Sequence, residues 1–307
     1  MNNSAKIVLG YVVICLIWGS TWLAIKFGLE SLTPLISAGL RFLLASIIIF
    51  TIVKIKKIEF HLDSLSIKLY IFLAFFSFAV PFWLVYWAEQ FVPSGLTSVM
   101  FGMYPFSVFV FSWFILKGES ADFYKFISVI FGFIGILIIF WDSLQVDIEN
   151  YSLGLLAVLL SAILQGSTAV TIKKWGTHLH PLSINAVPLF IAGISMVTLS
   201  FLLEKTSSWE FSFNAVLSII YLSIVGTIAA FTIYYWLLKQ INAVILALSS
   251  FITPIIAIIL GWLVLNEKLS AQVLFGALFV LIGILFGNFK QLRNQLRSKK
   301  VKYAKCS

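Results

Sequence analysis

The chain has 307 residues, of which 61% are hydrophobic and only 11% are charged. Soluble domains carry about 25% charged residues, so this composition excludes a globular protein with a water-exposed surface. The net charge of +9 is typical of some nucleic-acid-binding proteins, but the basic residues gather in loops and in a terminal tail, which argues against a nucleic-acid partner.

Ten apolar runs follow one another along the chain, and most approach the roughly 20 residues with which a helix crosses the hydrocarbon core. We expect helices at about 7–28, 33–53, 66–88, 92–116, 123–141, 152–172, 182–203, 213–237, 243–265 and 270–288. Strands of a membrane barrel would alternate in polarity and be about half as long. The first run is longer than the apolar part of a signal peptide and lacks a cleavage site, so we expect it to be retained. The sequence therefore predicts an all-α polytopic membrane protein with ten transmembrane helices.

The basic residues are distributed unevenly between the two ends of the predicted spans. Seven of them follow the tenth span. Ten spans place both termini on one side, and if that side is the cytoplasm, all 21 lysines and arginines lie there except Lys26, Arg41, Lys205 and Lys268. Cytoplasmic loops carry an excess of Lys and Arg. We therefore expect a multi-pass protein of the cytoplasmic (inner) membrane with both termini in the cytoplasm.

A stretch near the N-terminus returns in the second half of the chain. "IWGSTWLAIKFG" at 17–28 and "LQGSTAVTIKKW" at 164–175 share Gly-Ser-Thr, three spacer residues, Ile and Lys, and every matched pair is 147 residues apart. Further pairs follow at separations of 147 to 149 residues: Pro34 with Pro181, Tyr86-Trp87 with Tyr235-Trp236, Pro105 with Pro254, and Glu119 with Glu267. We infer two related halves, at 1–146 and 147–288, and a basic tail at 289–307.

Each half contains five predicted spans, and this odd number determines how the halves insert. The second half must cross the membrane in the opposite direction to the first. Inverted repeats of this kind are found in secondary transporters, whose substrate sites lie between the repeats. The sequence therefore predicts two inverted five-helix repeats around a central site.

The repeat places Lys26 at the outer end of the first span and Lys173 at the inner end of the sixth. Lys173 obeys the preference for cytoplasmic basic residues, whereas Lys26 does not. Two interpretations of Lys26 remain open. Its long side chain can reach the membrane interface, aided by Glu30 one turn later, or the two lysines can line opposite mouths of one pathway.

Three motifs are similar to those of a known family: Trp-Gly-Ser-Thr in the first span, Leu-Arg-Phe-Leu-Leu-Ala at 40–45 and the Leu-x-Gly-Glu turn after the fourth span. They resemble the EamA-like family of the drug/metabolite transporter superfamily, over about residues 7 to 288. The resemblance implies ten helices, cytoplasmic termini, and a cavity formed chiefly by spans one, three, four, six, eight and nine. It also implies export or exchange of small metabolites, often amino acids. One departure is that Gln165 takes the place of Trp18 in the second half.

Polar and aromatic side chains inside the spans are the candidate substrate ligands. A tyrosine hydroxyl at membrane depth needs a partner or water, which favours an inward orientation. On the third span, Trp83, Tyr86 and Gln90 are spaced to share one face. We expect the substrate to contact residues from both halves: Trp18, Thr21, Tyr86, Met103, Gln165, Tyr235 and Ser250.

Four further residues are expected to act as hinges or gates: Pro105, Pro254, Lys26 and Arg41. A proline inside a span removes one backbone hydrogen bond and can bend the helix. Arg41 lies eight residues into the second span, about 12 Å deep. An ionisable group at that depth is a functional candidate, although Arg41 can also bond loop carbonyls near the outer face.

Carboxylates are absent from the centres of the predicted spans, and Glu89 at the outer end of the third span is the nearest exception. A proton-driven antiporter usually keeps a carboxylate in the membrane interior. We therefore expect facilitated diffusion or substrate exchange rather than obligatory proton antiport.

These features favour one functional class over its competitors. No span offers the convergent catalytic groups of an enzyme or the charge rings and filter loop of a channel. The two cysteines and three histidines lack metal spacing, so we expect neither a metal nor another cofactor. We predict a transporter that exports a small metabolite, an amino acid or a related compound, as a monomer or homodimer in the lipid bilayer. The alternative is a lipid or polyprenyl-lipid carrier, which would open laterally to the bilayer.

Overall fold

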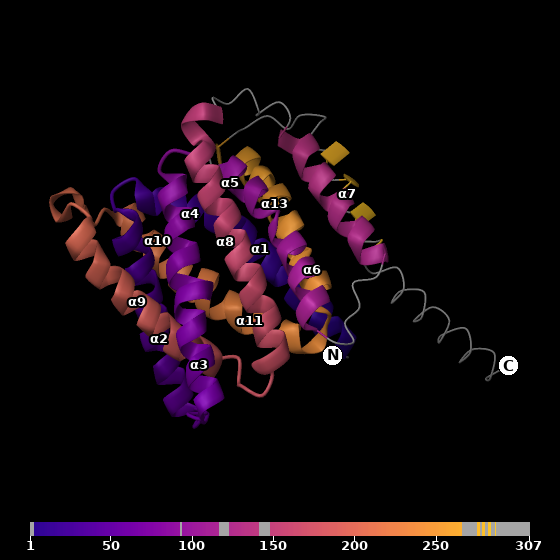
Figure 1. The fold of residues 1–307 in the computed structure, drawn as a ribbon. Coiled ribbons are helices and arrows are strands. Elements are labelled where there is room, and N and C mark those ends of the chain that lie inside the picture. The colour runs from indigo at the N-terminus through magenta and orange to yellow at the C-terminus, as the bar shows by residue number, and fades with distance from the viewer. Residues whose placement is uncertain are drawn as a thin grey trace.

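The computed structural model describes residues 3–92, 94–116, 123–140 and 148–265, together with seven residues between 275 and 286. Helices joined by short loops make up this part of the chain, and no strand occurs within it. They form a bundle in which segments from distant parts of the chain lie side by side (Figure 1). The basic tail, the turn residues Glu119 and Glu267, the boundary at 146–147 and most of the tenth predicted span lie outside the described residues.

Six helical segments are long and apolar enough to cross a membrane. They are α1 (Asn3–Leu29), α2 (Pro34–Ile55), the segment Ser64–Glu89, α8 (Ile148–Trp175), α9 (Ser183–Leu203) and the segment Phe213–Gln240. Shorter apolar helices lie between them, including α7 (Phe123–Phe140). Because several helices of this kind follow one another, the protein is a polytopic helical membrane protein, as predicted.

The fourth and ninth predicted spans are not continuous helices. The fourth span divides into α5 (Ser94–Phe101) and α6 (Tyr104–Ile115). The ninth span divides into α12 (Ala243–Ala247) and α13 (Ser249–Leu265). Pro105 lies in the first turn of α6, directly after the break, whereas Pro254 lies inside α13. A proline is well tolerated in a first turn, where its missing N–H would have no helical acceptor. The prediction that both prolines lie inside a helix is therefore wrong for Pro105.

Two π-helical segments, which the sequence analysis did not predict, interrupt the third and eighth spans. η1 (Ala74–Ala79) joins α3 (Ser64–Leu73) to α4 (Val80–Glu89), and η4 (Ile224–Ala229) joins α10 (Phe213–Ser223) to α11 (Ala230–Gln240). The same irregularity thus recurs at matching places in both halves of the sequence. In η4 the Thr227 hydroxyl donates to the Leu222 carbonyl at 2.8 Å, five residues back. Such segments redirect side chains and are frequent at functional sites.

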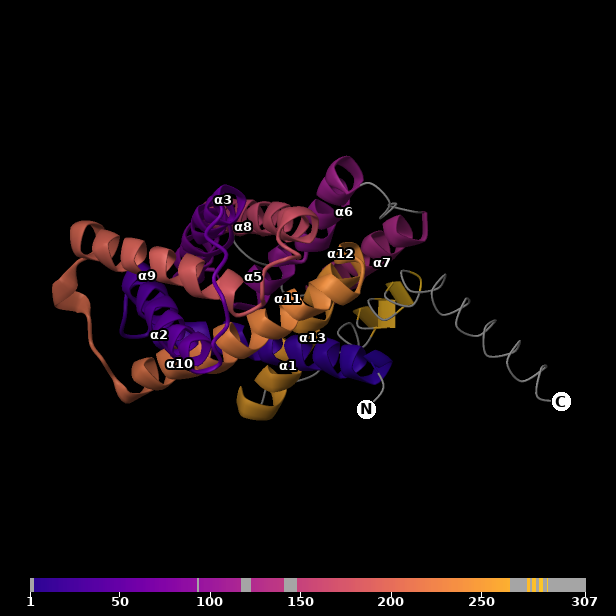
Figure 2. The same cartoon turned by 90° about the horizontal axis from the view of Figure 1, so that it is seen from below.

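The glycines of the repeated Gly-Ser-Thr motif bring helices of different halves together. A Cβ on Gly19 would lie 2.5 Å from Cγ2 of Ile256 on α13, and a Cβ on Gly166 would lie 2.4 Å from Oγ of Ser107 on α6. Small residues permit such close approach between membrane helices. The motif therefore packs α1 against α13 and α8 against α6, and Figure 2 shows α1 running beside α13.

Candidate functional site

A central cavity opens among the helices; the empty space in it is about 820 Å³, a volume that includes open solvent at its mouth. Its wall comes from spans one, three, four, six, eight and nine, with one residue from span two. The described wall residues are Trp18, Thr21, Trp22, Ile25, Arg41, Ser77, Phe82, Val85, Phe101, Tyr104, Gln165, Thr168, Ala169, Ile172, Phe231, Tyr234, Tyr235, Ser250 and Thr253.

Most of this wall consists of positions that the internal repeat matches with one another. The pairs, each 147 or 149 residues apart, are Trp18–Gln165, Thr21–Thr168, Trp22–Ala169, Ile25–Ile172, Phe82–Phe231, Val85–Tyr234, Phe101–Ser250 and Tyr104–Thr253. The other three described wall residues, Arg41, Ser77 and Tyr235, have no counterpart there. The two halves of the sequence therefore contribute equivalent helix faces to one cavity.

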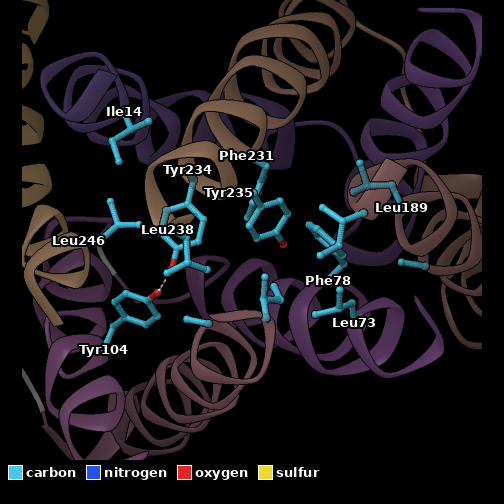
Figure 3. Close-up of a cluster of buried hydrophobic side chains, with 14 of the residues drawn as sticks. Ile14, Leu73, Phe78, Tyr104, Leu189, Phe231, Tyr234, Tyr235, Leu238 and Leu246 are labelled. Atoms are coloured by element: carbon cyan, nitrogen blue, oxygen red, sulfur yellow. Dashed lines mark hydrogen bonds between the residues drawn. The ribbon is translucent and has the colours of Figure 1, made fainter. Parts of the chain in front are cut away.

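Aromatic rings form one side of the cavity, around Tyr234 of α11. The ring centre of Tyr234 lies 5.3 Å from that of Trp18, and its hydroxyl is hydrogen-bonded to the hydroxyl of Tyr104 (Figure 3). Trp18 also meets Phe231 edge to face at 5.5 Å, and Tyr104 stacks on Phe101 at 5.7 Å. Aromatic pairs at these separations stabilise each other beyond simple burial. Rings from three spans thus hold one another in place.

Hydroxyl groups are the commonest polar groups of the wall, and four of them donate to the backbone carbonyl three residues earlier in the chain. Thr21 donates to Trp18 O at 2.8 Å and Thr168 to Gln165 O at 2.8 Å. On α13, Ser250 donates to Ala247 O at 2.9 Å and Thr253 to Ser250 O at 3.1 Å. A hydroxyl that uses its hydrogen in this way offers only acceptor lone pairs to a ligand.

Arg41 is the one charged residue of the described wall, and only 2% of its surface is exposed. Its Nε donates to Thr227 Oγ1 at 2.8 Å, its Nη1 to the Tyr86 hydroxyl at 3.2 Å and its Nη2 to Gly226 O at 3.3 Å. The Phe82 ring centre lies 4.9 Å from the guanidinium carbon. These partners belong to spans three and eight rather than to the outer loops. The π segment η4 therefore helps to hold the arginine at the cavity.

Five of the seven predicted substrate ligands line the cavity: Trp18, Thr21, Gln165, Tyr235 and Ser250. Tyr86 and Met103 are not among the described wall residues. Tyr86 is fully buried and accepts a hydrogen bond from Arg41, so it contacts the site indirectly. The face predicted for Trp83, Tyr86 and Gln90 is wrong, because Trp83 is 39% exposed and Gln90 lies exposed beyond the end of α4. The i, i+3, i+7 spacing places side chains on one side of a helix but does not determine how deeply each one is buried.

Lys26 and Lys173 share one equivalent contact in the two halves, a hydrogen bond to a carbonyl near the end of a helix. The Lys26 amino group donates to the carbonyl of Glu89, the last residue of α4, at 3.0 Å. The Lys173 amino group donates to Leu238 O and to a second carbonyl at the end of α11. The last carbonyls of a helix lack helical donors and carry partial negative charge, so a lysine stabilises them. The described partner of Lys26 is this helix end, not the predicted Glu30.

Glu89 ends α4, as expected from its place at the end of the third span, and it is fully buried. Neither carboxyl oxygen has a hydrogen-bond partner among the described residues. The equivalent position in the second half is Leu238. Burying an unpartnered carboxyl group is costly, so packing alone does not explain its presence. Glu89 is not part of the described cavity wall.

Several residues of the wall were not among the predicted ligands: Trp22, Ser77, Tyr104, Thr168, Phe231 and Tyr234. The repeat contained a signal for some of them, since Thr168 is the counterpart of Thr21, which was selected. Ser77 gave no such signal. It lies in η1, and this π segment of six residues is too short to leave a periodic pattern in the sequence.

Both halves of the chain match one and the same family model. The model of the EamA-like transporter family matches residues 5–141 and again residues 152–289. The uncharacterized transporter YoaV of Bacillus subtilis is 30% identical over 292 residues, which cover 95% of this chain and 99% of that protein.

Other relatives are similar over nearly the same length. Protein PecM of Dickeya dadantii is 26% identical over 293 residues, 93% of each chain. Protein PagO of Salmonella typhimurium is 23% identical over 274 residues, 89% of this chain and 90% of its own. A solved crystal structure that is 14% identical shares the fold, with a TM-score of 0.80 over 95% of this chain and 99% of its own. The polytopic bundle, the two family matches and these relatives show that the chain is a membrane transporter and belongs to the EamA-like transporter family.

Proposed function

We propose that the protein is a secondary transporter that exports a small metabolite, an amino acid or a related compound, by alternating access. The main support for this proposal is that most residues of the cavity wall form pairs at matching positions of the two halves. In transporters with inverted repeats the substrate binds between the repeats, and rocking of one repeat against the other opens the site to each side in turn. The aromatic rings and scattered hydroxyls suit a small amphipathic compound.

The proposal includes ten membrane-spanning helices in two inverted five-helix repeats, with both termini in the cytoplasm of an inner-membrane protein. The excess of basic residues on one predicted side supports this orientation. The matched π segments and lysine contacts support two equivalent halves. Reporter fusions after Asp147 and after Ser307 should report opposite sides of the membrane. A periplasmic signal from the Ser307 fusion would contradict the orientation.

Counterflow in proteoliposomes tests the transport activity. Vesicles loaded with an unlabelled amino acid should transiently accumulate the labelled compound, and the panel should extend to nucleobases, sugars and cationic drugs. Flipping of a fluorescent lipid without counterflow of any soluble metabolite would instead favour the lipid-carrier alternative.

Cysteine labelling tests whether the cavity is the substrate site. In a background with Cys15→Ser and Cys306→Ser, cysteines at Gln165 and Ser250 should react with a polar thiol reagent and be protected by the transported compound. Ser46 in α2 is buried, as Ser250 is, but lies outside the described wall, so a cysteine there is the matched control for Ser250 and should stay unreactive. Inert cysteines at both cavity positions would mean that these residues serve packing alone.

A further inference from the structure

The polar groups of the cavity are divided between acceptors and one strong donor. Thr21, Thr168 and Ser250 donate their hydroxyl hydrogens to helix carbonyls and therefore present acceptors. The amide nitrogen of Gln165 donates to Ser161 at 3.4 Å. Arg41 is thus the strongest donor that the described wall offers to a ligand.

The guanidinium of Arg41 has donors to spare. An arginine side chain carries five N–H groups in a planar fork. The described bonds use one N–H on Nε, one on Nη1 and one on Nη2. One N–H on each terminal nitrogen therefore has no partner among the described residues. Two neighbouring terminal N–H groups are the arrangement that binds both oxygens of a carboxylate.

The positive charge of Arg41 is also unbalanced by its described contacts. Thr227, Tyr86 and the Gly226 carbonyl are neutral, and the Phe82 ring provides only a cation–π contact. A charge at membrane depth is costly unless it pairs with an opposite charge, and the described wall contains no carboxylate. The second half has Pro188 at the equivalent position, so the charge lies on one side of the cavity only.

We propose that Arg41 binds a carboxylate of the transported compound, whose apolar part lies against Trp18, Phe231 and Tyr234. This inference rests on the proposed function, because it uses the same site, and it narrows the substrate class to small carboxylates. A cation or an uncharged compound leaves the guanidinium unpaired, so the site discriminates against both. A group that donates hydrogen bonds, such as an amine on the same compound, would face the hydroxyl acceptors across the cavity.

Matched ligand series test the inference on the wild-type protein alone. Each series holds the carbon skeleton constant and compares the amino acid, the carboxylate without the amine, the amine without the carboxylate, and the uncharged amide; alanine, leucine and phenylalanine skeletons give three series. Binding to the full chain in nanodiscs is measured by calorimetry. The two carboxylates of at least one series should bind at least tenfold more tightly than the matching amine and amide. Equal affinities, a preference for the amine or amide, or no carboxylate binding in any series would overturn the inference.

Variants locate the effect at Arg41. Arg41→Gln should reduce the carboxylate-to-amide affinity ratio to near one, and Arg41→Lys, which keeps the charge without the fork, should give an intermediate ratio. Lys174→Gln is the control, since Lys174 is a cation on α8 outside the described wall, stacked on Trp175, and should leave the ratio unchanged. If the Arg41 variants do not fold, the ligand series on the wild-type protein still tests whether the site prefers carboxylates. An unchanged ratio in folded Arg41→Gln would overturn the inference.

The same proteins separate this inference from the proposed function. Counterflow of a cationic or uncharged metabolite that Arg41→Gln leaves intact would support the proposed function and overturn the role of Arg41. A lack of counterflow with every compound would count against the proposed function itself.

Discussion

The two halves of the chain present the same positions to the cavity but fill them with different side chains. The first half contributes large rings at Trp18, Trp22, Phe101 and Tyr104, where the second half contributes Gln165, Ala169, Ser250 and Thr253. The opposite holds at Val85, whose counterpart is Tyr234. Equivalent positions of the two halves thus line the cavity. Because their side chains differ, the site between them is asymmetric.

The charged residues divide in the same way into shared and unshared ones. Lys26 and Lys173 stabilise the same helix end in each half. Arg41 and Glu89 have no charged counterpart, because the second half carries Pro188 and Leu238 there. The two matched lysines stabilise helix ends, which both halves need. A buried charge present in only one half is therefore a better candidate for function.

Filling the close contacts that the two halves share should have one of the largest effects on stability. Gly19→Ala and Gly166→Ala should each lower the free energy of unfolding by about 1–3 kcal/mol, because the added methyl group overpacks a helix contact. The two costs should be similar, since each added Cβ would also meet a backbone atom of the facing helix, Thr253 O at 3.2 Å from Gly19 and Val108 N at 3.1 Å from Gly166. Gly10→Ala is the control on α1, where the nearest atom would be a side-chain carbon at 3.3 Å. Unfolding in denaturing detergent measures the free energy of unfolding of all three variants. Values for Gly19→Ala and Gly166→Ala that equal the wild-type value would contradict the packing role.

Removing the two lysines should reveal how far the halves differ at the helix ends. Lys173→Met and Lys26→Met should each cost about 1.5–3 kcal/mol, the contribution of a hydrogen bond from a charged group. Lys26→Met should cost more, because it also leaves the buried carboxyl group of Glu89 without the nearby cation. Adding Glu89→Gln should then recover stability in the Lys26→Met background but not in the Lys173→Met background. Additive effects in both backgrounds would mean that Glu89 and Lys26 are uncoupled.

The two prolines should differ in their effect on transport rather than on stability. Pro254 lies inside α13, and the Thr253 hydroxyl donates to the Ser250 carbonyl that the proline leaves without its helical donor. Pro254→Ala restores that helical bond and should slow counterflow severalfold by stiffening a hinge. Pro105 begins α6 after an existing break, so Pro105→Ala should change the rate much less. Equal rates for both variants would exclude a hinge at Pro254.

The smallest effect is expected for proton coupling. Glu89 lies outside the described cavity wall, so its protonation should not compete with the substrate. An imposed pH gradient should therefore change the uptake rate little, in the wild-type protein and in Glu89→Gln alike. Concentrative uptake that collapses with an uncoupler and is lost in Glu89→Gln would show that the unshared carboxyl group couples transport to protons.

Much of the fold could be predicted because it depends on local properties of the chain. The length of an apolar run determines whether a helix can cross the bilayer, and the regular spacing of Gly19, Gly166 and the two matched lysines revealed the repeat. The break before Pro105 and the two π segments were not predictable in this way. Helix propensity is nearly uniform through such runs, so contacts with neighbouring helices decide where the backbone departs from regular geometry.

By itself, the sequence determined that this is a polytopic helical membrane protein of two related halves, and it identified most of the helices that face the cavity. Only the tertiary structure decided which side chains meet there. Arg41 binds the π segment η4, 185 and 186 residues further along the chain, and Tyr86, selected as a ligand, lies behind that arginine. Periodicity assigns a residue to a helix face, but the neighbour opposite that face is set by how helices from distant segments pack, and this information is not local.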